Sequence, residues 1–238
     1  MINVHFFGCS FTAGDELIDD EIFPWKHECK DFTEYFSRRV LPADYQIRNK
    51  KLAYPALVKS ESVNTFNHAT NGAGIQENLI NLLELISSGA KVDCVYFQIT
   101  PYGRELIIDS NNNATSLQLA WDTHGFEDYL KAKRISHKFW QYAVEDFADI
   151  IMIHSYLSNK GIKHKFVELA SWITEFRITD LEHTEFSYLV KEYRKLPILD
   201  LSDDIKQFPT LLGNHFSKEA HAEIARLITN DLSQNNIL

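Results

Sequence analysis

The sequence predicts one α/β domain with three layers, α/β/α, built around a mainly parallel sheet. Strand-like and helix-like segments alternate along the chain, which favours a parallel sheet covered by helices on both faces. Residues 92–99 are apolar almost throughout, as expected for a central parallel strand. With 238 residues, 45% of them hydrophobic, the chain suits a single domain, 1–238, with a sizeable core.

Five short segments are expected to form strands. Residues 2–7 are rich in β-forming side chains and stop at Gly8, which is typical of a buried strand that breaks into a turn. The apolar segment 92–99 ends at Pro101. The remaining expected strands are 62–67, 164–169 and, as a short edge strand, 196–201.

The longest expected helix covers residues 138–159, where apolar side chains recur on one side before Gly161 stops the helix. Ser217 is a suitable N-cap for a final helix that runs to about residue 232. Further helical segments are expected at 25–40, 51–59 and 75–86.

Three segments are expected to lie outside the regular layers. The polar residues 109–116 indicate an exposed loop. We expect insertions at about 16–59 and 170–195, the second irregular or partly helical, that cap the ligand-binding edge of the sheet.

Composition excludes several classes of function. The longest apolar stretches are far shorter than the roughly 20 residues of a membrane-spanning helix, and the first residues lack signal-peptide features, so we expect a cytoplasmic protein that does not bind membranes. The net charge of −9 argues against general binding of nucleic acids. The sequence leaves the oligomeric state open.

We expect no metal or other cofactor. The three cysteines, Cys9, Cys29 and Cys94, lack the paired spacing of a zinc site or a disulfide framework. The acidic clusters at 19–21 and 200–204 are more typical of solvated turns than of cation sites. No Walker loop, dinucleotide-binding glycine motif or zinc-protease motif is present.

The residues that could take part in catalysis or binding gather where strands are expected to end. Ser10 follows the first strand, Gly72 the second and Thr100 the third, while His215 precedes the last helix. The carboxyl ends of parallel strands form one edge, where ligands bind in such folds. The sequence therefore predicts that these side chains face one site.

The segment Phe-Gly-Cys-Ser-Phe-Thr-Ala-Gly at 7–14 resembles the first block of the SGNH (GDSL-like) hydrolases. The resemblance implies a flavodoxin-like sheet, with Ser10 as the nucleophile and its N–H as one oxyanion donor. Cys9 stands where that family usually has aspartate. This Gly-Cys-Ser-Phe-Thr variant is similar to sequences from phage and environmental bacterial genomes, so association with a virion is a further expectation if the source is a phage.

The second and third blocks resemble the family unequally. Residues 67–74 are similar to the block whose glycine N–H serves the oxyanion hole, with Gly72 the better match and Gly74 the alternative. The third block lacks the usual asparagine, so Thr100 or Tyr102 would have to donate in its place. Losing one such donor can cost about 10² to 10³ in turnover. Arg104 could bind an anionic substrate group or form a surface ion pair.

The last block, at 212–221, resembles the segment that opens the final helix of the family. His215 matches the catalytic base, Asn214 is a candidate substrate contact, and His221 is expected to be structural. Leu212 occupies the position of the triad aspartate. The resemblance leaves a Ser10–His215 dyad, with a backbone carbonyl or a distant carboxylate orienting the ring.

Taken together, the resemblance implies a serine esterase or acyl hydrolase that acts through an acyl-enzyme on a small-molecule or glycan ester, such as an O-acetylated carbohydrate. The alternative is a catalytically degraded member that serves as a binding module or a virion-associated structural module. An enzyme requires the Ser10 hydroxyl within hydrogen-bond reach of His215.

Overall fold

The computed structural model describes residues 1–30, 32–58, 61–100, 104–108, 114–118, 139–211 and 215–234. The strands are β1 (Ile2–Phe7), β2 (Val63–Asn67), β3 (Cys94–Gln98), β4 (Arg104–Ile108), β5 (Ala114–Gln118), β6 (Lys163–Glu168) and β7 (Ile198–Asp200). The longer helices are α3 (Phe32–Arg38), α4 (Tyr45–Leu52), α6 (Ile75–Ser87), α8 (Phe139–Asn159), α9 (Ser171–Glu182), α10 (Ser187–Tyr193) and α12 (Lys218–Gln234). Short helical turns are α1 (Ser10–Ala13), α2 (Asp19–Ile22), η1 (Pro24–Glu28), α5 (Tyr54–Leu57) and α11 (Ser202–Ile205).

Five strands form one parallel sheet in the order β2-β1-β3-β6-β7. This order corresponds to the flavodoxin-like arrangement, in which the chain winds outward on both sides of the first strand. The expected fold class and all five expected strands are confirmed, with β7 at the edge of the sheet.

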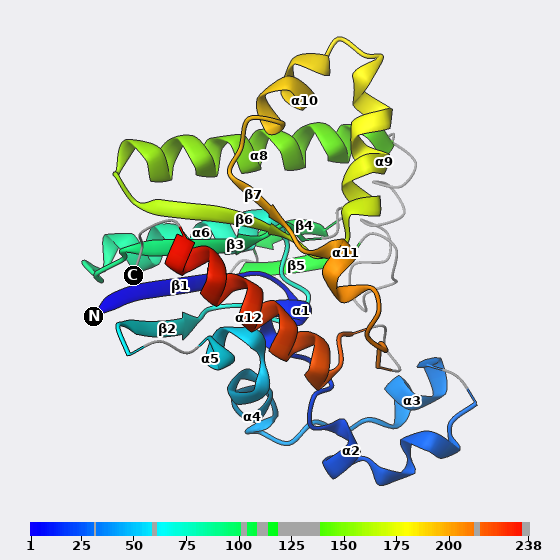
Figure 1. The fold of residues 1–238 in the computed structure, drawn as a ribbon. Coiled ribbons are helices and arrows are strands. Elements are labelled where there is room, and N and C mark those ends of the chain that lie inside the picture. The colour runs from blue at the N-terminus through cyan, green and yellow to red at the C-terminus, as the bar shows by residue number, and fades with distance from the viewer. Residues whose placement is uncertain are drawn as a thin grey trace.

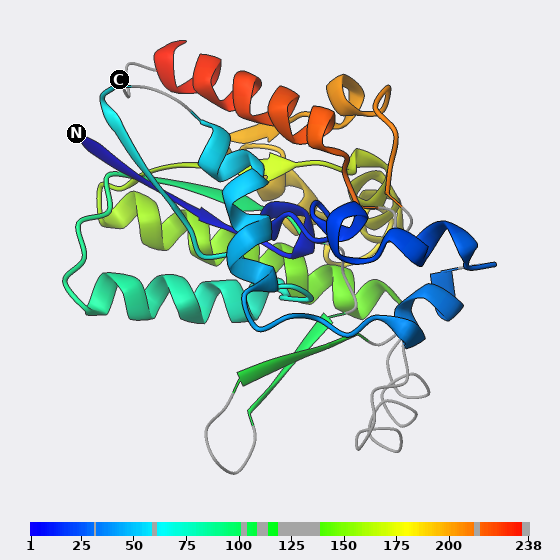
Figure 2. The same cartoon turned by 90° about the horizontal axis from the view of Figure 1, so that it is seen from below.

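Helices cover both faces of the sheet, as Figures 1 and 2 show. Alternate side chains of each buried strand point to opposite faces. On β3, Phe97 packs with α6, α8 and α10 in one apolar cluster, whereas Tyr96 packs with α5, α11 and α12 in the other. In Figure 2, α12 lies on one side of the sheet, and α6 and α8 lie on the other. The three-layer prediction is thus confirmed.

One local prediction was wrong, and another is confirmed in one of its two alternatives. Residues 114–118 form β5, which pairs antiparallel with β4, so the loop expected at 109–116 is wrong for residues 114–116. Residues 109–113 lie outside the described residues. The pairing of two strands supplies the backbone hydrogen bonds that make a polar strand stable, and a sequence pattern does not show its partner. Most of 170–195 is regular helix, α9 and α10, so the helical alternative for this segment is confirmed.

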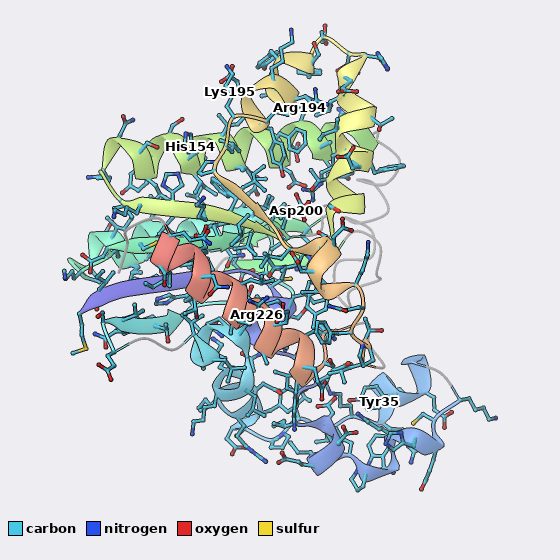
Figure 3. All side chains as sticks on the ribbon, in the orientation of Figure 1. Tyr35, His154, Arg194, Lys195, Asp200 and Arg226 are labelled. Atoms are coloured by element: carbon cyan, nitrogen blue, oxygen red, sulfur yellow. The ribbon has the colours of Figure 1, made fainter. Side chains whose placement is uncertain are left out.

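The first part of the amino-terminal insertion, with α2 and α3, lies beyond the edge at which the strands end, whereas α5 packs on one face of the sheet. Figure 1 shows α1 directly after β1, with α2 and α3 farther out on the same side. Tyr35, labelled in Figure 3, lies in this outer group of helices. Capping of the site by residues 16–59 and 170–195 stays a prediction.

All three cysteines are free thiols; Cys9 and Cys94 are buried, and Cys29 is partly exposed. Among the described residues, no helix is both long and apolar enough to cross a membrane.

Candidate active site

The turn after β1 requires glycine and delivers Ser10 to the site. Cys9 is extended, with φ −101° and ψ −156°, and Ser10 begins the short helix α1. A Cβ atom on Gly8 would lie 2.2 Å from Thr12 Oγ1, so any larger side chain would push α1 away from the strand. The N–H of Ser10 is at the first position of α1, where a helix provides no internal acceptor.

Gln98, at the end of β3, accepts hydrogen bonds from this turn. Its Oε1 atom accepts hydrogen bonds from the Cys9 N–H at 3.2 Å and from Thr12 Oγ1 at 2.6 Å. Thr12 Oγ1 also lies 2.8 Å from the hydroxyl of Tyr54. Because Gln98 is only 1% exposed, these bonds are shielded from water, and they fix the position of Ser10 relative to the sheet.

Asn78 links the nucleophile turn to the glycine-rich turn after β2. Its Oδ1 atom accepts from the N–H of Gly8 at 3.2 Å, and its Nδ2 donates to the carbonyl of Gly74 at 2.8 Å. Asn78 is fully buried in α6. The two backbone segments that the sequence predicted to form an oxyanion hole are therefore tied to one side chain.

Ser10 and His215 are in direct contact. His215 Nε2 lies 2.9 Å from Ser10 Oγ, and the side chain of His215 is 13% exposed. The chain around His215 is held by an isolated bridge between Thr210 and Phe216 and by a 2.7 Å hydrogen bond from the Leu211 N–H to the His215 carbonyl. The arrangement fits a nucleophile and a base that can exchange a proton.

Two carboxylates from the segment after α1 lie beside His215, and sequence reasoning missed both. Glu16 Oε2 is 3.4 Å from Nδ1 of the imidazole, and Asp15 Oδ2 is 4.0 Å from Nε2. The available signal was two consecutive acidic residues directly after Gly14, at the end of the block that carries Ser10.

Asp15 also belongs to a buried ionic cluster with Asp19, Arg39, Tyr35 and Tyr45. Arg39 is 2.9 Å from Asp15 and 3.4 Å from Asp19, and the Tyr45 hydroxyl donates to both carboxylates. The Tyr35 hydroxyl also donates to Asp19. Burial raises the pKa of Asp19 to about 7, against the opposing charge of Arg39. The expectation of a solvated turn at 19–21 was therefore wrong for Asp19.

The glycine turn after β2 has the conformation that glycine favours. Gly72 has φ +81°, and a Cβ atom there would meet no atom within 4 Å. Arg104, predicted to bind an anionic substrate group or to form a surface ion pair, donates from Nη1 to the carbonyl of Ala73 at 2.7 Å. In this structure Arg104 thus holds the backbone beside Gly72.

Thr100 lies at the carboxyl end of β3 in a small pocket. The pocket is lined by Phe11, Gln98, Ile99, Thr100, Glu168, Leu169, Ala170 and Thr174. Thr100 is 1% exposed, its carbonyl accepts from Arg177 at 2.9 Å, and within the described residues its Oγ1 has no hydrogen-bond partner. Tyr102, Leu212 and Asn214 lie outside the described residues.

His221 belongs to the core rather than to the site. It is 1% exposed, and its Nδ1 accepts from the N–H of Tyr54 at 3.1 Å. Burial lowers the pKa of His221 to about 3. Among the described residues, no group of three or more His, Cys, Asp or Glu side chains could hold a metal ion.

No protein-family model matches this sequence, and no curated protein matches it by sequence. Solved structures do. The chain superposes on a member of the lipolytic protein G-D-S-L family from Veillonella parvula with a TM-score of 0.50 and 12% identity, covering 98% of this chain and 99% of that one. TesA gives a TM-score of 0.51 at 9% identity, with 97% of each chain covered.

An acetyl xylan esterase, Est2A, from the rumen bacterium Butyrivibrio proteoclasticus gives a TM-score of 0.52 at 11% identity. The match covers 98% of this chain and 64% of that one. At such identities the likeness concerns the fold. The chain has the SGNH (GDSL-like) hydrolase fold, as its sequence blocks predicted.

Proposed function

We propose that this protein is a serine ester hydrolase in which Ser10 is the nucleophile and His215 is the general base. The observation that carries the proposal is the 2.9 Å separation between Ser10 Oγ and His215 Nε2. A fold alone does not define an activity. Here the fold brings a serine and a histidine, 205 positions apart in sequence, into hydrogen-bond contact at the edge where ligands bind.

The reaction follows from this contact. Ser10 Oγ bonds to the ester carbonyl carbon while its proton moves to His215 Nε2. When the tetrahedral intermediate collapses, the bond to the alcohol oxygen breaks, and His215 returns the proton to that oxygen. Water, activated by His215 in the same way, then cleaves the acyl-enzyme and restores Ser10. No metal or organic cofactor enters these steps.

The developing negative charge requires donors that are already in place. We assign this role to the N–H groups of Ser10 and Gly72, with Thr100 or Tyr102 as the third donor. Asn78 supports the assignment because its hydrogen bonds to Gly8 and Gly74 link the turn after β1 to the turn after β2. Thr100 lines the same small pocket as Phe11, the residue that follows Ser10 in sequence.

The proposed substrate is a small-molecule or glycan ester, for which an O-acetylated carbohydrate is the first candidate. The fold is shared with a protein described as an acetyl xylan esterase, and the pocket beside Phe11 is small, which favours a short acyl group. Asn214 remains a predicted substrate contact. A cytoplasmic location and a phage origin also remain predictions.

Hydrolysis of p-nitrophenyl acetate and of acetylated xylan tests the proposal. The Ser10→Ala and His215→Ala variants should each lower kcat by about 10⁴-fold or more, because residues that act as a unit lose activity together. The exposed Ser88 and His183 supply matched controls, Ser88→Ala and His183→Ala, which should retain wild-type rates. A folded wild type without esterase activity that binds glycans equally well as Ser10→Ala would instead indicate a binding module.

A further inference from the structure

We infer that Glu16 is the positioning carboxylate of His215, and that the acidic member of this site comes from the nucleophile's own segment instead of the segment before the histidine. The inference rests on the proposed function and deepens it. It begins from the replacement of the expected aspartate by Leu212 and from the 3.4 Å separation between Glu16 Oε2 and His215 Nδ1.

Each ring nitrogen of His215 faces a different group. Nε2 is 2.9 Å from Ser10 Oγ, and Asp15 approaches this same nitrogen only to 4.0 Å. Nδ1, on the opposite side of the ring, faces the carboxylate of Glu16. Of the two acidic side chains that approach the imidazole in the described structure, Glu16 is thus the one placed to orient the nitrogen that does not face the serine.

The backbone holds Glu16 in place through the nucleophile helix. The N–H groups of Gly14 and Asp15 both donate to the carbonyl of Ser10, at 2.9 and 3.0 Å. The N–H of Glu16 donates to Asp15 Oδ1 and to the Tyr45 hydroxyl, at 3.1 and 3.0 Å. A displacement of Ser10 would therefore move the carboxylate with it.

Glu16 has φ +68°, the only positive φ of a non-glycine residue in the described chain. Side chains with a Cβ atom rarely adopt this conformation, and such positions concentrate at functional sites. Glycine would relieve the backbone conformation but could not supply a carboxylate. The left-handed turn directs a side chain that is only 2% exposed toward the imidazole.

The charged groups around Glu16 include Arg39, Asp15, Asp19 and, after proton transfer, His215. Arg39 forms ion pairs with Asp15 and Asp19, which compensate for the negative charge of these two carboxylates. When His215 takes the Ser10 proton, the new positive charge on the imidazolium forms beside Glu16. Because the carboxylate is buried, its attraction for that charge is weakly screened.

The expected chemistry concerns the tautomer of His215. A carboxylate that accepts the Nδ1–H leaves Nε2 unprotonated and able to accept the serine proton. The present 3.4 Å separation is longer than a hydrogen bond, and such contacts shorten in substrate complexes. Glu16 touches the imidazole and not the substrate, so its removal should lower kcat with little change in KM.

The kinetic test compares Glu16→Gln, Glu16→Asp and the control Glu21→Gln on p-nitrophenyl acetate. Glu21 is exposed and pairs with Arg48 on the surface, so its variant should match the wild type. We expect Glu16→Gln to lower kcat by about 10² to 10⁴-fold, and Glu16→Asp, which retains the charge, to recover part of that loss. In a His215→Ala background, Glu16→Gln should add less than about twofold. Wild-type kcat in a folded Glu16→Gln variant would overturn the inference.

A second measurement requires no turnover. Nitrogen NMR of protein labelled at histidine reports which ring nitrogen of His215 carries the proton. The wild type should hold the Nδ1–H tautomer, and Glu16→Gln, whose amide can donate to Nδ1, should shift the ring toward the Nε2–H tautomer. An unchanged tautomer would overturn the role of Glu16 even if the enzyme is active. An inactive wild type with the expected tautomer shift would instead contradict the proposed hydrolysis alone.

Discussion

His221 accepts a hydrogen bond through Nδ1 from the backbone N–H of Tyr54, at a distance of 3.1 Å. The hydroxyl of Tyr54 lies 2.8 Å from Thr12 Oγ1 in the nucleophile turn. The final helix, which follows His215, therefore supports the segment that carries Ser10 as well. This support depends on a neutral ring, because a protonated Nδ1 could not accept the bond.

Replacement of His221 by asparagine should weaken the effect of acid on stability. The pKa of His221 is lowered to about 3 by burial, whereas an unfolded histidine titrates near ~6.5. As the pH falls through this interval, the unfolded state binds a proton that the folded state rejects, so the free energy of unfolding falls by up to about 1.4 kcal/mol per pH unit. His221→Asn retains an acceptor and removes the proton.

Urea denaturation at several pH values between about 4 and 7 measures this effect. The difference in unfolding free energy between wild type and His221→Asn should shrink as the pH falls. The exposed His183 provides a control, and His183→Asn should show the same pH dependence as the wild type. Parallel curves for wild type and His221→Asn would contradict the assignment of a buried neutral ring.

Asp19 should act in the opposite direction. Its pKa is raised to about 7 by burial, above the ~3.9 of an unfolded aspartate. Between these values the folded state holds a proton that the unfolded state has released, so this group lowers the free energy of unfolding as the pH rises. Asp19→Asn should remove that decrease, and the difference between wild type and variant should fall progressively from about pH 4 to pH 7. The exposed Asp44 supplies the control variant Asp44→Asn, for which no such trend is expected.

Gly72→Ala and Gly89→Ala form a matched pair that separates strain from function. Their φ angles are +81° and +78°, and a Cβ atom at either position would meet no atom within 4 Å. Both variants should lose about 1 kcal/mol of stability from the left-handed backbone. Only Gly72→Ala should also lower kcat, by about 10- to 10³-fold, because it alone alters the proposed oxyanion donor. Equal activities of the two variants would remove Gly72 from the proposed oxyanion hole.

Gln98→Met should destabilise the nucleophile turn. Methionine has similar size, but its sulfur is only a weak acceptor in place of the amide oxygen that the Cys9 N–H and the Thr12 hydroxyl use, and a buried donor that loses its hydrogen bond costs about 1–3 kcal/mol. We expect a loss of about 2–4 kcal/mol in denaturant unfolding, together with loss of esterase activity. Gln207 is exposed, so Gln207→Met should stay within about 0.5 kcal/mol of the wild type. A stable and fully active Gln98→Met variant would show that the turn does not depend on these bonds.

The main layers of the fold could be predicted from sequence because their signals are local. The apolar segment at 92–99 and the helical spacing at 138–159 each depend on burial of neighbouring residues. The hairpin of β4 and β5 was missed because its stability comes from pairing between two strands, one of them polar. Its register, such as Arg104 opposite Gln118, is not encoded in either strand alone.

The site could be predicted only in part. Gly8, Ser10 and His215 were found through ordered sequence blocks, and the structure brings Ser10 and His215 together. Glu16 was missed because its contact with His215 joins positions 199 apart and depends on a left-handed turn. Asp19 was misjudged for a related reason, since its burial requires Arg39 and two tyrosines that follow later in the chain.

The most direct test of the central claim is the covalent labelling of intact protein with a fluorophosphonate probe, read by mass spectrometry. The 2.9 Å contact between Ser10 Oγ and His215 Nε2 predicts one adduct per chain, located on Ser10, that is absent from both Ser10→Ala and His215→Ala. A folded wild-type protein without an adduct, or one labelled equally well in the His215→Ala variant, would contradict an activated Ser10–His215 pair.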